Sequence, residues 1–184
     1  FWYAASAAGA GRPIGCDHRS LGGQMNNGKV TLVVLVGSLI MAILQQSVAP
    51  WMAIFGVKPI FGLMFAVCCS LLIRPGAGAA VGSLCGLLEG CIPGANLTHY
   101  VVSRTVSCFL ASLSRSIEVE FGVIICAIVV VITTFGAEMV FMFLAPPPDI
   151  TRFVQDTIGS AMYNGVLAIP TYALLRKIAK PKKV

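Results

Sequence analysis

Charged residues are scarce in this sequence of 184 residues. Lys, Arg, Asp and Glu together make up 11% of the chain, whereas an ordinary soluble domain has roughly a quarter of its residues charged. Hydrophobic residues make up 57%, and the mean hydropathy is +0.88. Because a soluble fold must present a polar outer layer to water, this composition excludes an ordinary soluble domain and predicts an all-α integral membrane protein.

Histidine is nearly absent, and so are the common catalytic and metal-binding motifs. His18 and His99 are the only two histidines, which leaves catalytic triads and zinc sites short of ligands. The sequence lacks the motifs G-x-x-x-x-G-K-[ST], G-x-S-x-G and H-E-x-x-H, and it has no paired carboxylates at metal-binding spacing. We therefore expect no enzyme activity, no cofactor and no metal.

The seven cysteines do not change this expectation. No two of them form a C-x-x-C pair, and those inside or at the end of apolar runs are Cys68, Cys69, Cys85, Cys91, Cys108 and Cys126. We interpret them as structural thiols that act as small hydrophobic side chains.

The net charge of +6 comes largely from the end of the chain. Five basic residues crowd into the last nine positions, namely Arg176, Lys177, Lys180, Lys182 and Lys183. They directly follow an apolar run and form no stripe with interleaved aromatic residues. This pattern favours a cytoplasmic membrane flank that contacts lipid and argues against nucleic acid as a partner.

Proline-punctuated apolar runs predict about six transmembrane helices. The predicted spans are Val30 to Val48, Pro59 to Ile73, Gly76 to Ile92, Leu97 to Leu113, Phe121 to Leu144 and Phe153 to Leu175. Only Arg74 and Pro75 separate the second span from the third, so we expect a tight hairpin there. Pro170 is expected to kink the sixth span or to loosen its turn.

Lys and Arg counts in the short loops predict the orientation. With the amino terminus inside, Lys29, Arg74, Arg115 and the basic tail are cytoplasmic, whereas Lys58 and Arg152 lie outside. We expect a bacterial inner-membrane protein with both termini in the cytoplasm. It divides into a disordered or non-native extension (1–24), a six-helix membrane domain (25–175) and a basic cytoplasmic tail (176–184).

Glycines recur at every fourth position of the third span. They are Gly78, Gly82, Gly86 and Gly90. One helix face therefore carries no side chains, which permits close packing where lipid provides no hydrophobic drive for association. We predict that a helix of the same chain packs there, with another protein as the alternative.

Polar residues are predicted to gather toward the outer leaflet. Glu89 lies late in the third span, and a carboxylate inside a span is a functional candidate. An antiparallel fourth helix would bring His99 or Arg104 to it. Glu138 lies at a similar depth in the fifth span, as do Gln45 and Gln46 in the first. The group is either a small-molecule pocket or a docking surface. We assign Asn164, in the sixth span, to the same buried polar cluster as Glu89, His99, Arg104 and Glu138, and we expect it to make a hydrogen bond between helices.

Two stretches of small and apolar residues stand out, 76–89 and 161–170, and the second is followed closely by the basic tail. On these stretches, and from about Val48 onward, the chain resembles the rod shape-determining protein MreD family. The resemblance is strongest over residues 76–89, GAGAAVGSLCGLLE, which is similar to the family's G-x-x-x-G-F-x-x-G-L-x-x-D stretch. Residues 161–170, AMYNGVLAIP, and the basic tail also resemble the carboxyl-terminal end of the family's sequences. Glu89 is the acidic residue nearest to the family's Asp, one position before it in this spacing, and Ser83 stands where the family often has Phe.

The resemblance implies a fold, a set of partners and a function. The fold is that of the substrate-binding subunits of energy-coupling-factor transporters. The partners are MreC, MreB, RodA and a class B penicillin-binding protein. The function is a non-catalytic membrane scaffold of the cell-wall elongation complex that maintains rod shape. The alternative is a vitamin-binding transporter subunit that uses the same fold, with Glu89, Glu138, Arg104 and nearby aromatic residues around its ligand.

Overall fold

Six α-helices make up most of the computed structural model, which describes residues 27–54, 56–91, 97–114 and 122–179. The helices are α1 (Asn27–Ser47), α2 (Phe61–Ser70), α3 (Pro75–Gly90), α4 (Leu97–Ser114), α5 (Val123–Leu144) and α6 (Ile150–Ala179). Within these residues there is no strand, only an isolated bridge between Ile54 and Val57. The all-helical prediction is confirmed. The predicted extension, residues 1–24, lies outside the described residues.

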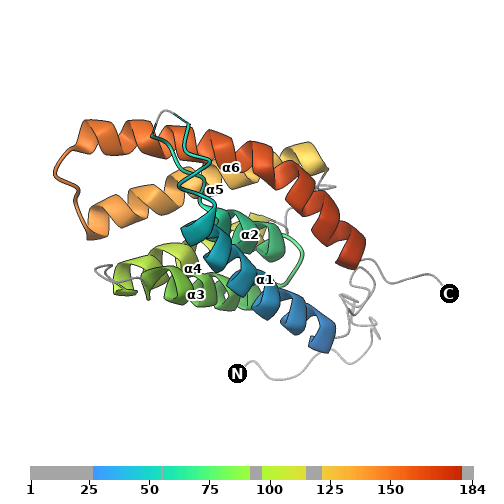
Figure 1. The fold of residues 1–184 in the computed structure, drawn as a ribbon. Helices are drawn as coiled ribbons and strands as arrows, with labels where there is room; N and C mark the ends of the chain where they lie inside the picture. Colours follow the sequence, from blue (N-terminus) through green and yellow to red (C-terminus); the bar gives the residue numbers. More distant parts are fainter. Residues whose placement is uncertain (1–26, 55, 92–96, 115–121, 180–184) are drawn as a thin grey trace, which may run out of the picture.

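Helix α2 forms the centre of the fold. It is apolar on every side, and all ten of its residues are buried, as expected for a helix without a polar face. It contacts α1, α3, α4, α5 and α6, and Figure 1 shows it between the α3–α4 pair and the α5–α6 pair. Ten residues rise only about 15 Å. The predicted second span, Pro59 to Ile73, is therefore too long, because Pro59 and Ile60 precede the helix and Leu71 begins a turn.

Two of the helices are long and apolar enough to cross a membrane, α5 and α6. Helix α6 starts earlier and ends later than predicted and passes through Pro170 without interruption. It changes direction toward its carboxyl end, the part that contains Pro170 (Figure 1). Arg176 and Lys177, the first residues of the predicted tail, lie in its last turn.

The first turn of α2 is capped by side chains from distant helices. Ile60 occupies the position before the helix and has no side-chain acceptor. Instead, Oδ1 of Asn164 in α6 accepts from the Ile60 N–H at 2.9 Å, and Oε1 of Gln45 in α1 accepts from the Phe61 N–H at 2.7 Å. Nε2 of Gln45 also donates to the Pro59 carbonyl at 3.1 Å. Since a helix that begins in the interior has no water for its free N–H groups, these bonds fix α2 between α1 and α6.

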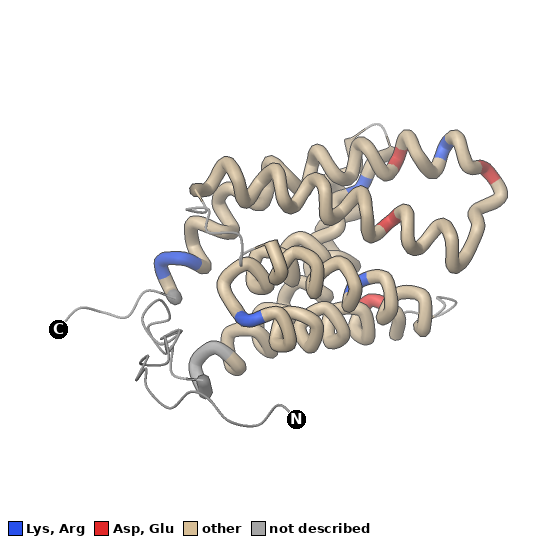
Figure 2. Tube along the Cα trace, turned by 180° about the vertical axis from the view of Figure 1, so that it is seen from behind, with Lys and Arg blue, Asp and Glu red and all other residues tan. Residues whose placement is uncertain are grey.

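The interior is polar in many places, and the exterior is largely apolar. Large apolar side chains are more than half exposed on α1, α5 and α6 in particular, among them Leu32, Ile43, Ile124, Ile132, Met162 and Val166. Buried polar or charged residues include Ser38, Ser70, Glu89, Ser103, Arg104, Ser107, Ser112, Thr134, Thr157, Ser160 and Asn164. Figure 2 shows the acidic residues of the described part in the half of the molecule away from the two termini.

We expect Asn164→Leu to destabilise the fold by about 1–3 kcal/mol, because it leaves the part-buried Ile60 N–H without its acceptor while keeping the side-chain volume. The measurement is thermal unfolding of the purified protein in mild detergent, followed by circular dichroism. Gln155→Leu is the matched control, since Gln155 is an exposed amide on the same helix. Equal unfolding midpoints for the two variants would contradict this role for Asn164.

Candidate functional site

The glycine face of α3 packs directly against α4. A Cβ added at any of the four glycines would overlap atoms of that helix. The nearest neighbours are Ser112 for Gly78, Arg104 and Cys108 for Gly82, Tyr100 and Val101 for Gly86, and Leu97 for Gly90. The helix that covers this face therefore belongs to the same chain, and the face is not available to another protein.

Arg104 of α4 is held by two carboxylates from two other helices. Its Nε lies 2.9 Å from Oε2 of Glu89 in α3, and its Nη1 lies 2.8 Å from Oε1 of Glu138 in α5. The hairpin of α3 and α4 brings Glu89 to Arg104, and the packing of α5 on α4 adds Glu138. The ion trio of Glu89, Arg104 and Glu138 thus links three helices through charged side chains.

Because the trio is buried, the stability of the fold depends on these ion pairs. The side chains of Arg104, Glu89 and Glu138 are 3%, 6% and 13% exposed. An isolated charge at such a position would be costly, whereas a paired and hydrogen-bonded one is tolerated. With one guanidinium for two carboxylates, the formal charge of the trio is negative.

Helix α2 approaches the trio at its second residue, Gly62. A Cβ at this position would overlap Oε1 of Glu89 and lie 2.9 Å from Sγ of Cys85. The glycine therefore provides the space that the carboxylate occupies. It also places Glu89 beside the positive end of the α2 dipole, which offsets part of the trio's negative charge. Sequence reasoning missed Gly62, because a single glycine in an apolar run carries no distinct signal.

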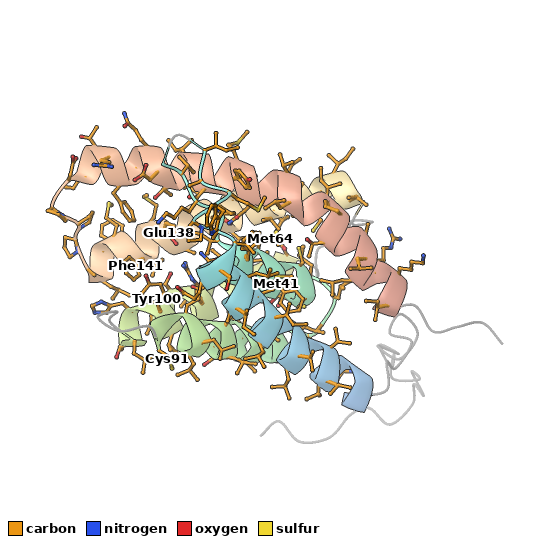
Figure 3. The ribbon with its side chains drawn as sticks, viewed as in Figure 1. Met41, Met64, Cys91, Tyr100, Glu138 and Phe141 are labelled. Carbon is orange, nitrogen blue, oxygen red and sulfur yellow. The ribbon has the colours of Figure 1, made fainter. Side chains whose placement is uncertain are left out.

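Aromatic rings lie beside the trio, one turn before Arg104 on α4 and one turn after Glu138 on α5. The Tyr100 ring centroid is 5.6 Å from Cζ of Arg104, within cation–π range. The ring centroids of Phe141 and Tyr100 are 4.8 Å apart. The His99 ring meets the Phe141 ring edge-on, with 6.4 Å between the centroids. Figure 3 shows Tyr100, Phe141 and Glu138 between α4 and α5. Of the two partners proposed for Glu89, Arg104 forms the ion pair, while His99 belongs to the aromatic group.

Asn164 does not belong to this cluster. Besides its bond to Ile60, its Nδ2 donates to Oγ1 of Thr134 at 3.4 Å. Grouping Asn164 with Glu89, Arg104 and Glu138 was therefore wrong, because the residue faces the start of α2 and the middle of α5. The interhelical hydrogen bond that the sequence suggested is nonetheless present.

A cleft of about 310 Å³ opens between the end of α1 and the end of α3. Its lining consists of Ala42, Ile43, Gln45, Gln46 and Ser47 from α1 and of Leu88 and Glu89 from α3. Glu89 therefore belongs both to the ion trio and to the lining of this cleft, since one of its carboxylate oxygens pairs with Arg104 and its side chain also borders the cleft. The prediction that Gln45 and Gln46 lie near Glu89 agrees with this arrangement.

Metal-binding clusters of His, Cys, Asp and Glu are not found among the residues that the structure describes. No family model, curated protein or solved structure matches this chain.

We expect Gly86→Leu to lower the stability by about 3 kcal/mol or more, because the new side chain would overlap the backbone of Tyr100 and Val101. Gly136→Leu in α5 is the matched control. It makes the same chemical change in a helix, at an exposed position with no neighbouring atom within 4 Å. Thermal unfolding in detergent measures both, and equal stability of the two variants would show that α3 and α4 do not touch at Gly86.

Proposed function

We propose that this chain is an integral membrane protein of the bacterial inner membrane, with six helices in the bilayer and both termini in the cytoplasm. The apolar side chains on the outside of α1, α5 and α6 support this placement, since lipid is the solvent that such a surface fits. The basic residues Arg74, Arg176 and Lys177 follow the positive-inside pattern for that orientation.

Within the membrane we propose a non-catalytic scaffold of the MreD type. The observation that carries this proposal is the ion trio, in which the charged groups bind one another. Arg104 directs two of its nitrogens at Glu89 and Glu138 and places its face near the Tyr100 ring. Charged side chains arranged in this way fix the positions of helices, which is the task of a scaffold.

The residues that carry the resemblance to the MreD family form part of the glycine face of α3 and of the ion trio. The stretch 76–89 contains three glycines of the face that packs on α4 and ends at Glu89 of the trio. We therefore propose that the chain takes part in the cell-wall elongation complex and binds MreC, with MreB, RodA and a class B penicillin-binding protein as further members. Because α4 covers the glycine face, MreC would bind elsewhere, on the exposed apolar faces.

A vitamin-binding subunit of an energy-coupling-factor transporter is the second candidate. The cleft between α1 and α3 favours it, because its volume lies at the lower end of the range for small-molecule sites. The aromatic residues Tyr100 and Phe141, which lie near Glu138, also fit the hypothesis of a ligand site.

Affinity purification separates the two candidates. The full chain, tagged at its carboxyl end, is extracted in mild detergent and the proteins that co-purify are identified by mass spectrometry. We expect MreC and the other elongation proteins at levels well above those recovered with an unrelated, equally tagged polytopic membrane protein. Recovery of a coupling subunit with ATPases would instead support the transporter, and the absence of elongation proteins would contradict the scaffold.

A further inference from the structure

The cleft between α1 and α3 collects hydrogen-bond acceptors from two sources. The first is the end of α1. The amide hydrogens of Val48 and Ala49 both bond to the Leu44 carbonyl, and Trp51 and Met52 both bond to that of Val48. In the part of the chain that the structure describes, the carbonyls of Gln45, Gln46 and Ser47 therefore accept no backbone hydrogen bond. These three residues line the cleft.

The end of α1 is also not neutralised by a cation. Its last turn contains no basic residue, although a helix carries partial negative charge at its carboxyl end and favours a cation there. The residues that carry these three carbonyls line the cleft, so this partial charge lies close to it.

Glu89 is the second source of acceptors. Oε2 of Glu89 is bound to Arg104, while among the described residues Oε1 has only the Cys85 thiol as a hydrogen-bond partner, at 3.8 Å. Glu138 shares the same guanidinium, so the cation does not fully neutralise either carboxylate. The cleft is therefore lined on one side by Glu89, whose carboxylate shares the guanidinium of Arg104 with Glu138 and lies beside the first turn of α2, and on the other side by the last residues of α1.

The remaining lining is apolar. Ala42, Ile43 and Leu88 provide it. A volume of about 310 Å³ holds roughly ten water-sized groups. A matching molecule thus has about ten non-hydrogen atoms inside the cleft, with an apolar body and a positively charged group that donates several hydrogen bonds.

We propose that the cleft between α1 and α3 binds a primary ammonium group carried on an apolar body. The ammonium donates to Glu89 and to the free carbonyls at the end of α1, and the body lies against Ile43 and Leu88. The ammonium can come from a soluble amine or from a phosphatidylethanolamine headgroup, which has the same donor chemistry. This site is independent of the scaffold proposal, since it requires no partner protein.

The test uses phenethylammonium as the probe and 2-phenylethanol as its neutral counterpart of the same shape. Binding to the full chain in phosphatidylcholine nanodiscs is measured by isothermal titration calorimetry. We expect saturable binding of the amine and at least about tenfold weaker binding of the alcohol, because a charge-assisted hydrogen bond is lost. Equal binding of the two probes, or no binding of the amine, would overturn the proposal.

Variants locate the site. Ile43→Trp fills the cleft from a side chain that is 56% exposed and should abolish binding without affecting the fold. Leu39→Trp is the matched control, one turn away on the same helix and 55% exposed, and it should bind the amine as the unaltered chain does. Unchanged binding in Ile43→Trp would overturn the assignment.

Charge variants test the electrostatic part. Glu138→Gln removes the trio's excess charge without touching the cleft and should weaken amine binding about threefold to tenfold. Glu89→Gln should weaken it further. If Glu89→Gln does not fold, the amine affinities of Glu138→Gln and Ile43→Trp still test the site. Full affinity in Glu138→Gln would contradict the proposed role of the trio.

Nanodiscs that contain phosphatidylethanolamine distinguish the two sources of the ammonium. A lower apparent affinity of phenethylammonium in these discs than in phosphatidylcholine discs would identify the lipid headgroup as the competing occupant. Equal affinity in both would exclude the lipid headgroup and leave a soluble amine as the source of the ammonium. Either result presupposes the saturable binding that supports the site.

Discussion

The guanidinium of Arg104 is the point on which the arrangement of the helices depends. It lies in α4, is almost completely buried, and takes its two ionic partners from α3 and α5. Since an unpaired charge in such a place is far less favourable than a paired one, any packing that separates these three helices is strongly disfavoured. The hydroxyl of Ser103, which donates to the Ala137 carbonyl, adds a second link between α4 and α5.

The close approach of α3 and α4 is what allows this pairing. The glycines of α3 let the backbones of α3 and α4 meet, so that Glu89 and Arg104 lie within hydrogen-bond distance. Gly62 serves the same purpose on α2, where it leaves room for Glu89. Small residues and charged residues therefore act together, because the first create the short distances that the second require.

Helix α2 depends on its surroundings in a different way. Its apolar side chains account for its burial, but its first N–H groups need acceptors, and its own sequence provides none at the cap. Gln45 and Asn164 supply them. The protein thus buries polar side chains within an otherwise apolar core and exposes large apolar side chains on its surface, an exposure that is expected where lipid replaces water as the surrounding solvent.

Much of this could be predicted from local patterns and some of it could not. Apolar runs and prolines predict the helices to within a few residues, and the spacing of the glycines identifies a close contact. The short loop after Gly90 suggests that Glu89 and Arg104 meet. The sequence does not reveal that Asn164 caps α2, because that contact joins residues 104 positions apart. Nor does it decide between Arg104 and His99 as the partner of Glu89, because the contact of the His99 ring with Phe141 depends on how α5 packs on α4.

The most direct test of this account is the stability of charge variants of the trio, measured by reversible unfolding in mild detergent. We expect Arg104→Met to lower the free energy of unfolding by about 3–5 kcal/mol, because two carboxylates then remain buried without a cation. The triple variant Glu89→Gln, Arg104→Met and Glu138→Gln should recover much of that loss, since no uncompensated charge remains. Losses that simply add up across the three positions would show that the side chains do not act as one unit and would contradict the account.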